Sequence, residues 1–217
     1  MKSVPRASFA GSVCLAFLAG FVDAVGFILS GGLFVSFMSG NSTQGGVEFL
    51  NGQPLEGLLA LALVSAFFLG VVAAQASKHL FPRLGLPQRI LGLGFALAVA
   101  SALVMRWPQP GVSLMAVAAV MGATNTLFVS GGRARVAITY ATGTLVSLGI
   151  AVADRAVGGA PTPWKRPLAL WAAITVGAGV GTFAWTVAGA AALLIAAVGL
   201  LLIGGLLAIA ASVAKHR

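Results

Sequence analysis

A single acidic residue, Asp23, stands inside a long apolar stretch near the start of this chain. Placing a carboxylate at the centre of a bilayer costs at least about 2.5–3.5 kcal/mol on insertion scales, so such acids are usually functional. An acid in this setting can bind a cation, accept a coupling proton or pair with a base. The alternative is a structural hydrogen bond to a neighbouring helix. Asp23 is therefore the first candidate for a binding or coupling group.

A run of small polar residues follows this acid after a pair of glycines. On a helix, Ser36, Ser39 and Thr43 recur at i, i+3 and i+7 and would share one face. Gly40 and Asn41 lie within the same run. Hydroxyls, amides and a closely approachable backbone suit an ion or a polar solute. Small residues are also how membrane helices pack together, so ligand contact and helix packing both stay open.

Both features recur in the second half of the chain, about 102–103 residues later. Asn125 stands where the first copy has its acid, so one copy can titrate and the other cannot. Internal duplication with interrupted hydrophobic segments at matching places indicates a transporter-like binding site. The second copy of the polar run consists of Thr139, Thr142, Gly143 and Thr144.

Helix ends near these runs could attract an anion. If helices begin near Leu33 and Ala134, their first turns present free N–H groups and the positive end of a helix dipole. Arg133, directly before the second start, would add to that attraction. The residues thus allow a small anion, a polar metabolite or a cation, and the sequence alone leaves the substrate open.

Composition places the chain in a membrane. It is 59% hydrophobic and 8% charged, with a mean hydropathy of +1.03, whereas about 25% of the residues of a soluble domain are charged. This composition excludes a soluble catalytic or nucleic-acid-binding domain. We expect residues 1–217 to form a single membrane domain.

Apolar stretches long enough to cross a bilayer fill most of the sequence. Two further stretches, 33–50 and 134–153, follow the glycine pairs Gly31-Gly32 and Gly131-Gly132, which suit a break in a helix. The six expected spans cover residues 9–30, 55–77, 89–106, 111–130, 167–187 and 189–212.

The distribution of basic residues decides whether the two further stretches cross. If neither crosses and the N-terminus is cytoplasmic, all of the 13 Lys and Arg residues except Arg106 lie on the cytoplasmic side. If both cross, the bias becomes much weaker. Because Lys and Arg accumulate in cytoplasmic loops, six spans with both termini cytoplasmic are favoured. The net charge of +9 then reflects topology, with binding of anionic lipids as the alternative.

Six spans divide into two units of three, residues 9–106 and 111–212. A unit with an odd number of spans is inserted upside down when it is repeated in tandem. The two broken segments would then enter from opposite faces and meet near the midplane, as in inverted-repeat transporters. We therefore predict an all-α integral membrane protein of about six transmembrane helices, with a broken or re-entrant helical segment after the first span of each repeat.

Catalytic and cofactor motifs find little support. His79 and His216 have no neighbouring His, Cys or acid at metal-ligand spacing. The single cysteine, Cys14, can form no disulfide within the chain. There is no nucleophile elbow and no phosphate-binding loop. We expect no enzyme, no metal, no cofactor and no nucleic-acid partner.

The paired motifs resemble those of the YoaK family, also called the DUF1275 domain. The first block reads Gly20-Phe-Val-Asp23-Ala-Val-Gly-Phe and continues at Phe34-Val-Ser-Phe-Met-Ser-Gly-Asn41. The second block reads Asn125-Thr-Leu and Thr139-Tyr-Ala-Thr-Gly-Thr144. Ser39 stands where family blocks usually have threonine. The resemblance implies a bacterial multi-pass inner-membrane protein, for which transport is the most that the family suggests.

Three hypotheses of function follow. The first is a secondary transporter or permease for a small solute, with Asp23 as the ion-coupling or substrate-binding group. The second is a dimeric channel or passive pore, since six spans make a small bundle. The third is a membrane partner or sensor that transports nothing. In each case we expect the lipid bilayer and a small molecule or ion as partners, and a homodimer is compatible with all three.

Overall fold

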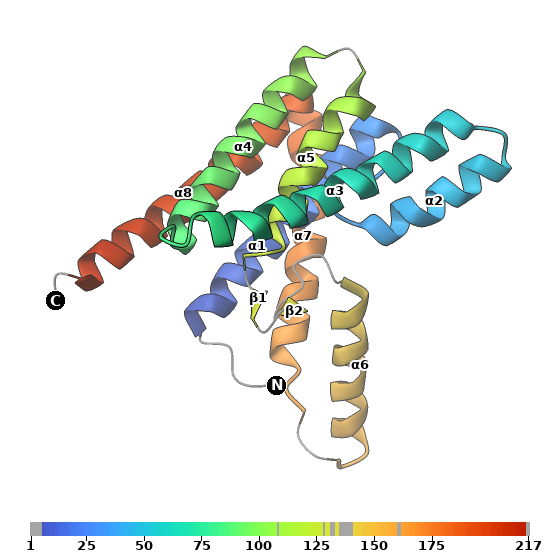
Figure 1. The fold of residues 1–217 in the computed structure, drawn as a ribbon. Coiled ribbons are helices and arrows are strands. Elements are labelled where there is room, and N and C mark those ends of the chain that lie inside the picture. Colours follow the sequence, from blue (N-terminus) through green and yellow to red (C-terminus); the bar gives the residue numbers. More distant parts are fainter. Residues whose placement is uncertain are drawn as a thin grey trace.

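The computed structural model describes residues 6–107, 109–127, 129–130, 133–134, 141–159 and 162–215. In these ranges the chain is helical, apart from short connections and one antiparallel pair of two-residue strands, β1 (Val129–Ser130) and β2 (Arg133–Ala134). The helices pack as long, crossing rods (Figure 1). They are α1 (Arg6–Ser30), α2 (Met38–Leu50), α3 (Pro54–Leu80), α4 (Leu86–Arg106), α5 (Pro110–Thr124), α6 (Ala141–Ala156), α7 (Lys165–Ala188) and α8 (Ala192–Lys215).

Four stretches are long and apolar enough to cross a membrane: Phe9–Ser30, Pro54–Leu80, Leu86–Arg106 and Lys165–Val213. The last covers 49 residues and contains both α7 and α8. The two helices are separated by a 3-10 turn at Gly189–Ala191, where Gly189 has a φ of 55° that favours glycine. The prediction of an all-α membrane protein is therefore confirmed.

The stretch predicted at 111–130 is shorter than expected, because α5 ends at Thr124. Three consecutive polar side chains hydrogen-bond back to carbonyls of the last turn. Thr124 Oγ1 donates to Val120 O at 2.8 Å, Asn125 Nδ2 to Met121 O at 3.0 Å, and Thr126 Oγ1 to Ala123 O at 2.8 Å. Such bonds compete with continuation of a helix.

The two broken segments form short helices that start later than predicted. Segment 33–50 is helical only from Met38, so the predicted start near Leu33 is wrong. In segment 134–153, Ala134 belongs to β2 instead of a helix, and the described helix is Ala141–Ala156. Helices of 13 and 16 residues are about 20 and 24 Å long at 1.5 Å per residue. Both are shorter than the roughly 30 Å hydrocarbon core of a bilayer. In Figure 1, α2 and α6 each begin near the middle of the molecule and run to its edge.

Glycines set the close contact between α1 and α7. A Cβ placed on Gly20 of α1 would overlap the carbonyl oxygen of Ile174 in α7. One placed on Gly177 of α7 would overlap the carbonyl oxygen of Phe17 in α1. Backbones can approach this closely only where neither helix carries a side chain, as is common between membrane helices.

The contact between α3 and α5 is built in the same way. A Cβ on Gly122 of α5 would overlap the carbonyl oxygen of Phe67, and one on Gly70 of α3 that of Ala119. A third pair, α4 and α8, packs closely through Gly94 and Gly204. Each of the three main helix contacts thus depends on glycine from both partners.

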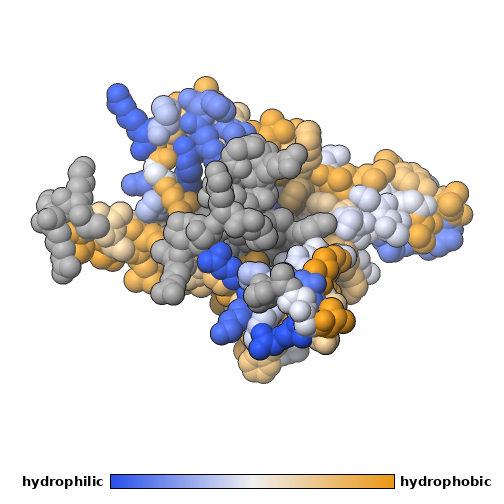
Figure 2. All heavy atoms as spheres, turned by 90° about the horizontal axis from the view of Figure 1, so that it is seen from below, coloured by the Kyte–Doolittle hydropathy of each residue, from blue (hydrophilic) through white to orange (hydrophobic). Residues whose placement is uncertain are grey.

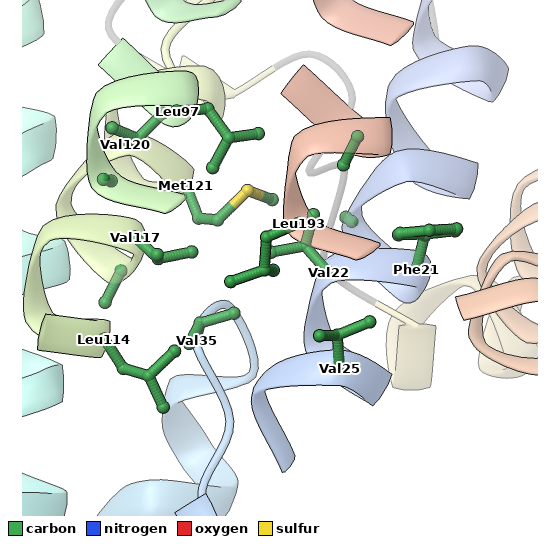
Figure 3. Packing of buried hydrophobic residues seen from close by; sticks show 14 of the residues in the cluster. Phe21, Val22, Val25, Val35, Leu97, Leu114, Val117, Val120, Met121 and Leu193 are labelled. Atoms are coloured by element: carbon green, nitrogen blue, oxygen red, sulfur yellow. The ribbon is translucent and has the colours of Figure 1, made fainter. Parts of the chain in front are cut away.

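The buried core lies where α1, α4, α5 and α8 meet. Figure 3 shows Val35, from the connection between α1 and α2, pointing in among core side chains of α1, α5 and α8. Val35 is completely buried, as are Val22 and Leu114. The non-helical connection is thus anchored in the core by its own side chain.

On the face seen in Figure 2, hydrophobic side chains cover much of the two arms of the molecule, and hydrophilic side chains gather closer to its middle. Large apolar side chains project from most of the helices, among them Leu50 at 91% exposure and Phe183 at 69%. In water such a surface would be unfavourable, whereas lipid tails satisfy it.

Candidate functional site

The end of α1 turns the chain back toward the middle of the molecule. Gly31 and Gly32 have φ values of 75° and 138°, a region that favours glycine. The N–H of Gly32 donates to the carbonyl of Phe27 at 2.9 Å, as in a helix that ends with a left-handed glycine. Residues 31–37, which we term the 31–37 connection, are non-helical and lead to α2.

Asp23 holds this connection. Its Oδ1 accepts hydrogen bonds from the backbone N–H groups of Val35, at 2.9 Å, and of Ser36, at 2.7 Å. Its Oδ2 accepts a hydrogen bond from Ser36 Oγ at 2.5 Å. These donors would otherwise have no helical partner, because residues 35 and 36 precede α2. The carboxylate therefore takes the place of the backbone carbonyls that would accept these hydrogen bonds in a helix. Non-helical backbone of this kind is tolerated in membranes only inside protein or beside a cavity.

Asn41 holds the connection from the other side. Its Oδ1 accepts from the N–H of Phe34 at 2.8 Å, and its Nδ2 donates to the carbonyl of Phe34 at 2.6 Å. Asn41 is fully buried in the first turns of α2. The two polar residues together satisfy the backbone of 34–36, so the connection has a defined conformation.

A cavity of about 560 Å³ lies beside Asp23. It is bounded by α1, the 31–37 connection, the first turns of α6, and α7. Its polar lining consists of Asp23 and Ser36 from the first half of the chain and Thr142 and Thr182 from the second. The cavity therefore brings Asp23 and Ser36 of the first copy of the repeated motif together with Thr142 of the second.

Three phenylalanines line the same cavity. Phe27 and Phe34 have ring centroids 4.9 Å apart, and Phe34 and Phe37 are 5.2 Å apart with edge-to-face rings. Phe27 is 42% exposed and Phe37 is 37% exposed. The aromatic wall comes from the end of α1 and from the 31–37 connection, next to the carboxylate.

The predicted stripe of hydroxyls on one helix face is wrong. Ser36 lies outside α2, because Asp23 takes up its N–H and Oγ, while Ser39 and Thr43 lie on the helix. Ser39 and Thr43 are exposed and do not line the cavity, and Thr43 Oγ1 donates to the carbonyl of Ser39 at 3.1 Å. Gly40 packs against the ring of Phe37. Only Ser36 from the stripe lies at the cavity.

The described residues of the second copy lie at the end of α5 and at the start of α6. Asn125 caps α5 and donates to the carbonyl of Met121 in its own helix. In α6, Thr142 lines the cavity, while Gly143 and Thr144 do not. Thr144 Oγ1 donates to Ala141 O at 2.6 Å, and the carbonyl of Gly143 accepts from Ser147.

Two predicted residues are not placed at the site. Thr139 lies outside the described residues. The backbone of Arg133 belongs to β2, well before the first residue of α6, Ala141. The expected arrangement of an arginine directly before a helix start is therefore not present at α6.

A second cavity, of about 410 Å³, lies between α3, α4 and α5. Lys78 and Arg89 line it, and both donate to the protein itself. Lys78 Nζ donates to Thr126 O at 2.5 Å, and Arg89 donates to the carbonyls of Phe81 and Leu84 at 3.0 and 3.1 Å. Cations beside the last carbonyls of a helix stabilise its end, which accounts for both residues.

Sequence reasoning missed the contributions of α7 and of the aromatic residues. Ile174, Ala178 and Thr182 recur at i, i+4 and i+8 and line the cavity from α7. Their spacing marks one helix face, but nothing in it distinguishes this face from ordinary packing. Phe34 and Phe37 stand within the recognised motif, and were not singled out because phenylalanine is common in membrane helices.

Comparison with known proteins identifies the family of this chain. Residues 11–206 match the family described as "Protein of unknown function (DUF1275)". The chain is 33% identical over 167 residues to the UPF0700 transmembrane protein RA0705 of Rhizobium meliloti (strain 1021), covering 77% of this chain and 71% of that protein. No solved structure matches. The chain thus belongs to the DUF1275 family of membrane proteins.

Proposed function

We propose that this protein is a secondary transporter or permease for a small solute, and that the cavity beside Asp23 is its solute site. The observation that carries the proposal is the connection held by an acid at the cavity wall. A carboxylate that replaces secondary structure in a membrane helix bundle can release or reshape that backbone when its charge or its partners change. This is the kind of coupling that a transporter needs between ion binding and conformational change.

The architecture that we propose is a pair of inverted three-span repeats. The glycine contacts support it, because they are equivalent in the two halves. The contact of Gly20 with Ile174 corresponds to that of Gly122 with Phe67, with shifts of 102 residues from α1 to α5 and 107 from α3 to α7. The same two shifts relate the remaining contacts. The contact of Phe17 with Gly177 corresponds to that of Ala119 with Gly70.

The contact between α4 and α8 supports the same relation. A Cβ on Gly94 would lie 2.9 Å from the side chain of Leu201, and one on Gly204 would lie 2.8 Å from that of Leu91. A shift of 110 residues turns Gly94 into Gly204 and Leu91 into Leu201. The two contacts are therefore exchanged by a twofold axis between α4 and α8. In Figure 1 the two helices run in opposite directions. A twofold axis between antiparallel membrane spans lies in the membrane plane, as in inverted repeats.

The ends of the helices are consistent with six spans and two re-entrant segments. In Figure 1, the α3–α4 turn, the α6–α7 connection and the end of α8 lie in the lower or left part of the molecule, and the α2–α3, α4–α5 and α7–α8 connections in the upper or right part. Because basic residues lie at the first set of ends, we propose that this side faces the cytoplasm. Both termini would then lie on the cytoplasmic side of a bacterial inner membrane.

Labelling of single cysteines tests this topology. In a Cys14→Ala background, we expect Gln53→Cys and Trp107→Cys to react with an impermeant maleimide from outside, and Arg83→Cys and Val157→Cys only after lysis. All four residues are exposed in the fold, so each cysteine can react once the label reaches its side of the membrane. If α2 and α6 crossed completely, Gln53 and Trp107 would become internal and Arg83 external. That pattern would reject the six-span arrangement.

A flux measurement tests the transport function. Protein in proteoliposomes is challenged with a library of small solutes under an imposed proton or sodium gradient, and uptake or charge movement is recorded. We expect gradient-dependent uptake that Asp23→Asn abolishes while the variant remains monodisperse. Conductance without gradient coupling would instead identify a channel. No flux of any solute, with a protein partner that co-purifies, would identify a non-transporting membrane protein.

A further inference from the structure

We infer that the cavity beside Asp23 selects an organic cation with an apolar body, held with its ammonium group toward the carboxylate and its body against the phenylalanine wall. This inference rests on the proposed function, whose solute site it specifies. It narrows the choice among anion, polar metabolite and cation that the sequence leaves open.

The charge of the cavity is the first observation. Among the described residues, Asp23 is the one ionisable group in the lining, and no basic side chain lines the cavity with it. An anion would meet a negative charge in a poorly screened site, where like charges repel more strongly than in water. A cation gains the same interaction with the opposite sign.

The carboxylate lies at the wall of the cavity. Its two oxygens accept hydrogen bonds from Val35 N, Ser36 N and Ser36 Oγ, and the backbone N–H of Phe37 also acts on it. Asp23 is half-buried and is among the residues that line the cavity. A quaternary ammonium group is attracted by the charge of the carboxylate and needs no free lone pair, so the bonds that hold the 31–37 connection can stay in place.

The aromatic wall is the second observation. Phe27, Phe34 and Phe37 all line the cavity that contains the acid. The electron-rich faces of aromatic rings attract cations, above all quaternary ammonium groups, which have no N–H to donate. An acid combined with several aromatic rings is a recognition surface for such a group, whereas the carboxylate repels an anion such as a carboxylic acid in its ionised form.

The size and the remaining lining complete the description of the ligand. A volume of about 560 Å³ falls in the range of about 300–1,000 Å³ that holds small organic molecules. A bare hard cation would need six or more oxygen ligands, while the lining hydroxyls are those of Ser36, Thr142 and Thr182. Ser36 Oγ already donates to Asp23. Most other lining side chains are aliphatic, including Ile28, Leu145 and Ile174, which suits an apolar body.

Equilibrium binding of a matched pair of probes tests the inference. Benzyltrimethylammonium and benzylsulfonate have the same ring and a similar head, with opposite charge. Each is titrated calorimetrically into the full-length protein in lipid nanodiscs. We expect saturable binding of the cation and none of the anion. Tetramethylammonium, which lacks the apolar body, should bind at least tenfold more weakly than the benzyl cation.

Variants locate the binding at the cavity. Phe27→Leu and Phe37→Leu keep apolar volume but remove a ring, and each should raise the Kd of benzyltrimethylammonium about three- to tenfold. Asp23→Asn should raise it more than tenfold. Phe183→Leu, which replaces a lipid-exposed ring of α7 outside the cavity, should leave the Kd unchanged.

The outcomes separate this inference from the transport function. Equal binding of both probes, binding of neither, or an unchanged Kd in both phenylalanine variants would overturn it, even if Asp23→Asn fails to fold. Binding with the expected variant pattern but without flux in proteoliposomes would support the cation site and reject the transporter. Gradient-driven flux of another solute class without binding of the cation would support the transporter and reject the cation site.

Discussion

The two halves of this protein pack in the same way but carry an acid and an amide at the matching place. Asp23 reaches across to the 31–37 connection and holds two backbone N–H groups and a hydroxyl, a contact that we term the latch. Asn125 donates to the carbonyl of Met121. An aspartate can carry a charge or a proton, whereas an asparagine does not titrate. A shared scaffold therefore carries one ionisable group at this place, and the difference indicates where function departs from architecture.

The strongest test of the shared scaffold is to fill its glycine contacts. We expect Gly20→Leu and Gly122→Leu to prevent close packing of α1 on α7 and of α5 on α3, because the added side chain would overlap backbone. Both should abolish the monodisperse peak in size-exclusion chromatography. Gly179→Leu is the control, since a Cβ there meets nothing within 4 Å. A tolerated leucine at one of the two contact sites would show that the halves pack differently.

Replacing Asp23 and Asn125 one at a time should destabilise the protein to different degrees. Asp23→Ala leaves three donors without their partner, and unsatisfied donors cost about 1–3 kcal/mol each, so we expect a loss of at least about 2 kcal/mol. Asn125→Ala removes a neutral amide, whose hydrogen bonds contribute about 0.5–1.5 kcal/mol each, less than those of a charged group. Thermal unfolding in detergent, followed by circular dichroism, measures the difference. Equal losses would mean that the acid has no special structural role.

The next pair compares Asn41 with Thr144, which matches it in the second half. Asn41→Ala removes two hydrogen bonds to Phe34, so we expect about 1–3 kcal/mol of destabilisation. Thr144 donates to Ala141 in its own helix, and Thr144→Val should cost about 0.5 kcal/mol. Unfolding midpoints of the two variants check this order. A larger effect at Thr144 would contradict the assignment of Asn41 as the main polar anchor of its segment.

Ser36→Ala tests one bond of the latch. The variant loses the hydrogen bond from Oγ to Asp23 but keeps both backbone donors, so we expect a loss of about 1.5–3 kcal/mol, the range for a bond to a charged group. Since the cavity keeps its acid, the benzyl cation should still bind within about threefold of the original Kd. Calorimetric titration and thermal unfolding on the same sample check both statements. Loss of binding with unchanged stability would place Ser36 in the ligand contact instead.

The smallest effects are expected on the exposed face of α2. Ser39→Ala and Thr43→Ala change side chains that do not line the cavity, so both should stay within about 0.5 kcal/mol of the original stability. Solute uptake in proteoliposomes should be unchanged as well. A strong loss of uptake in either variant would show that this face contacts a second copy of the chain or the solute path.

Much of the fold could be predicted from local patterns. Long apolar stretches predict the helices, and the glycine pair at 31–32 predicts the break after α1. The same patterns failed at the end of α5, where three polar side chains turn back on their own helix. They also failed at Ser36, because a helical period says nothing of a side chain 13 residues earlier that captures its N–H. Periodicity reports a helix face only where the helix exists.

The sequence by itself determined that the chain lies in a membrane, that it repeats, and that a lone acid stands in its first span. These properties follow from composition and spacing along the chain. Tertiary structure alone decided that the acid holds the 31–37 connection, that three phenylalanines gather beside it, and that α6 and α7 from the other half complete the cavity. The physical reason is that hydrophobic burial specifies which face of a helix is covered, while the partner that covers it depends on packing between distant segments.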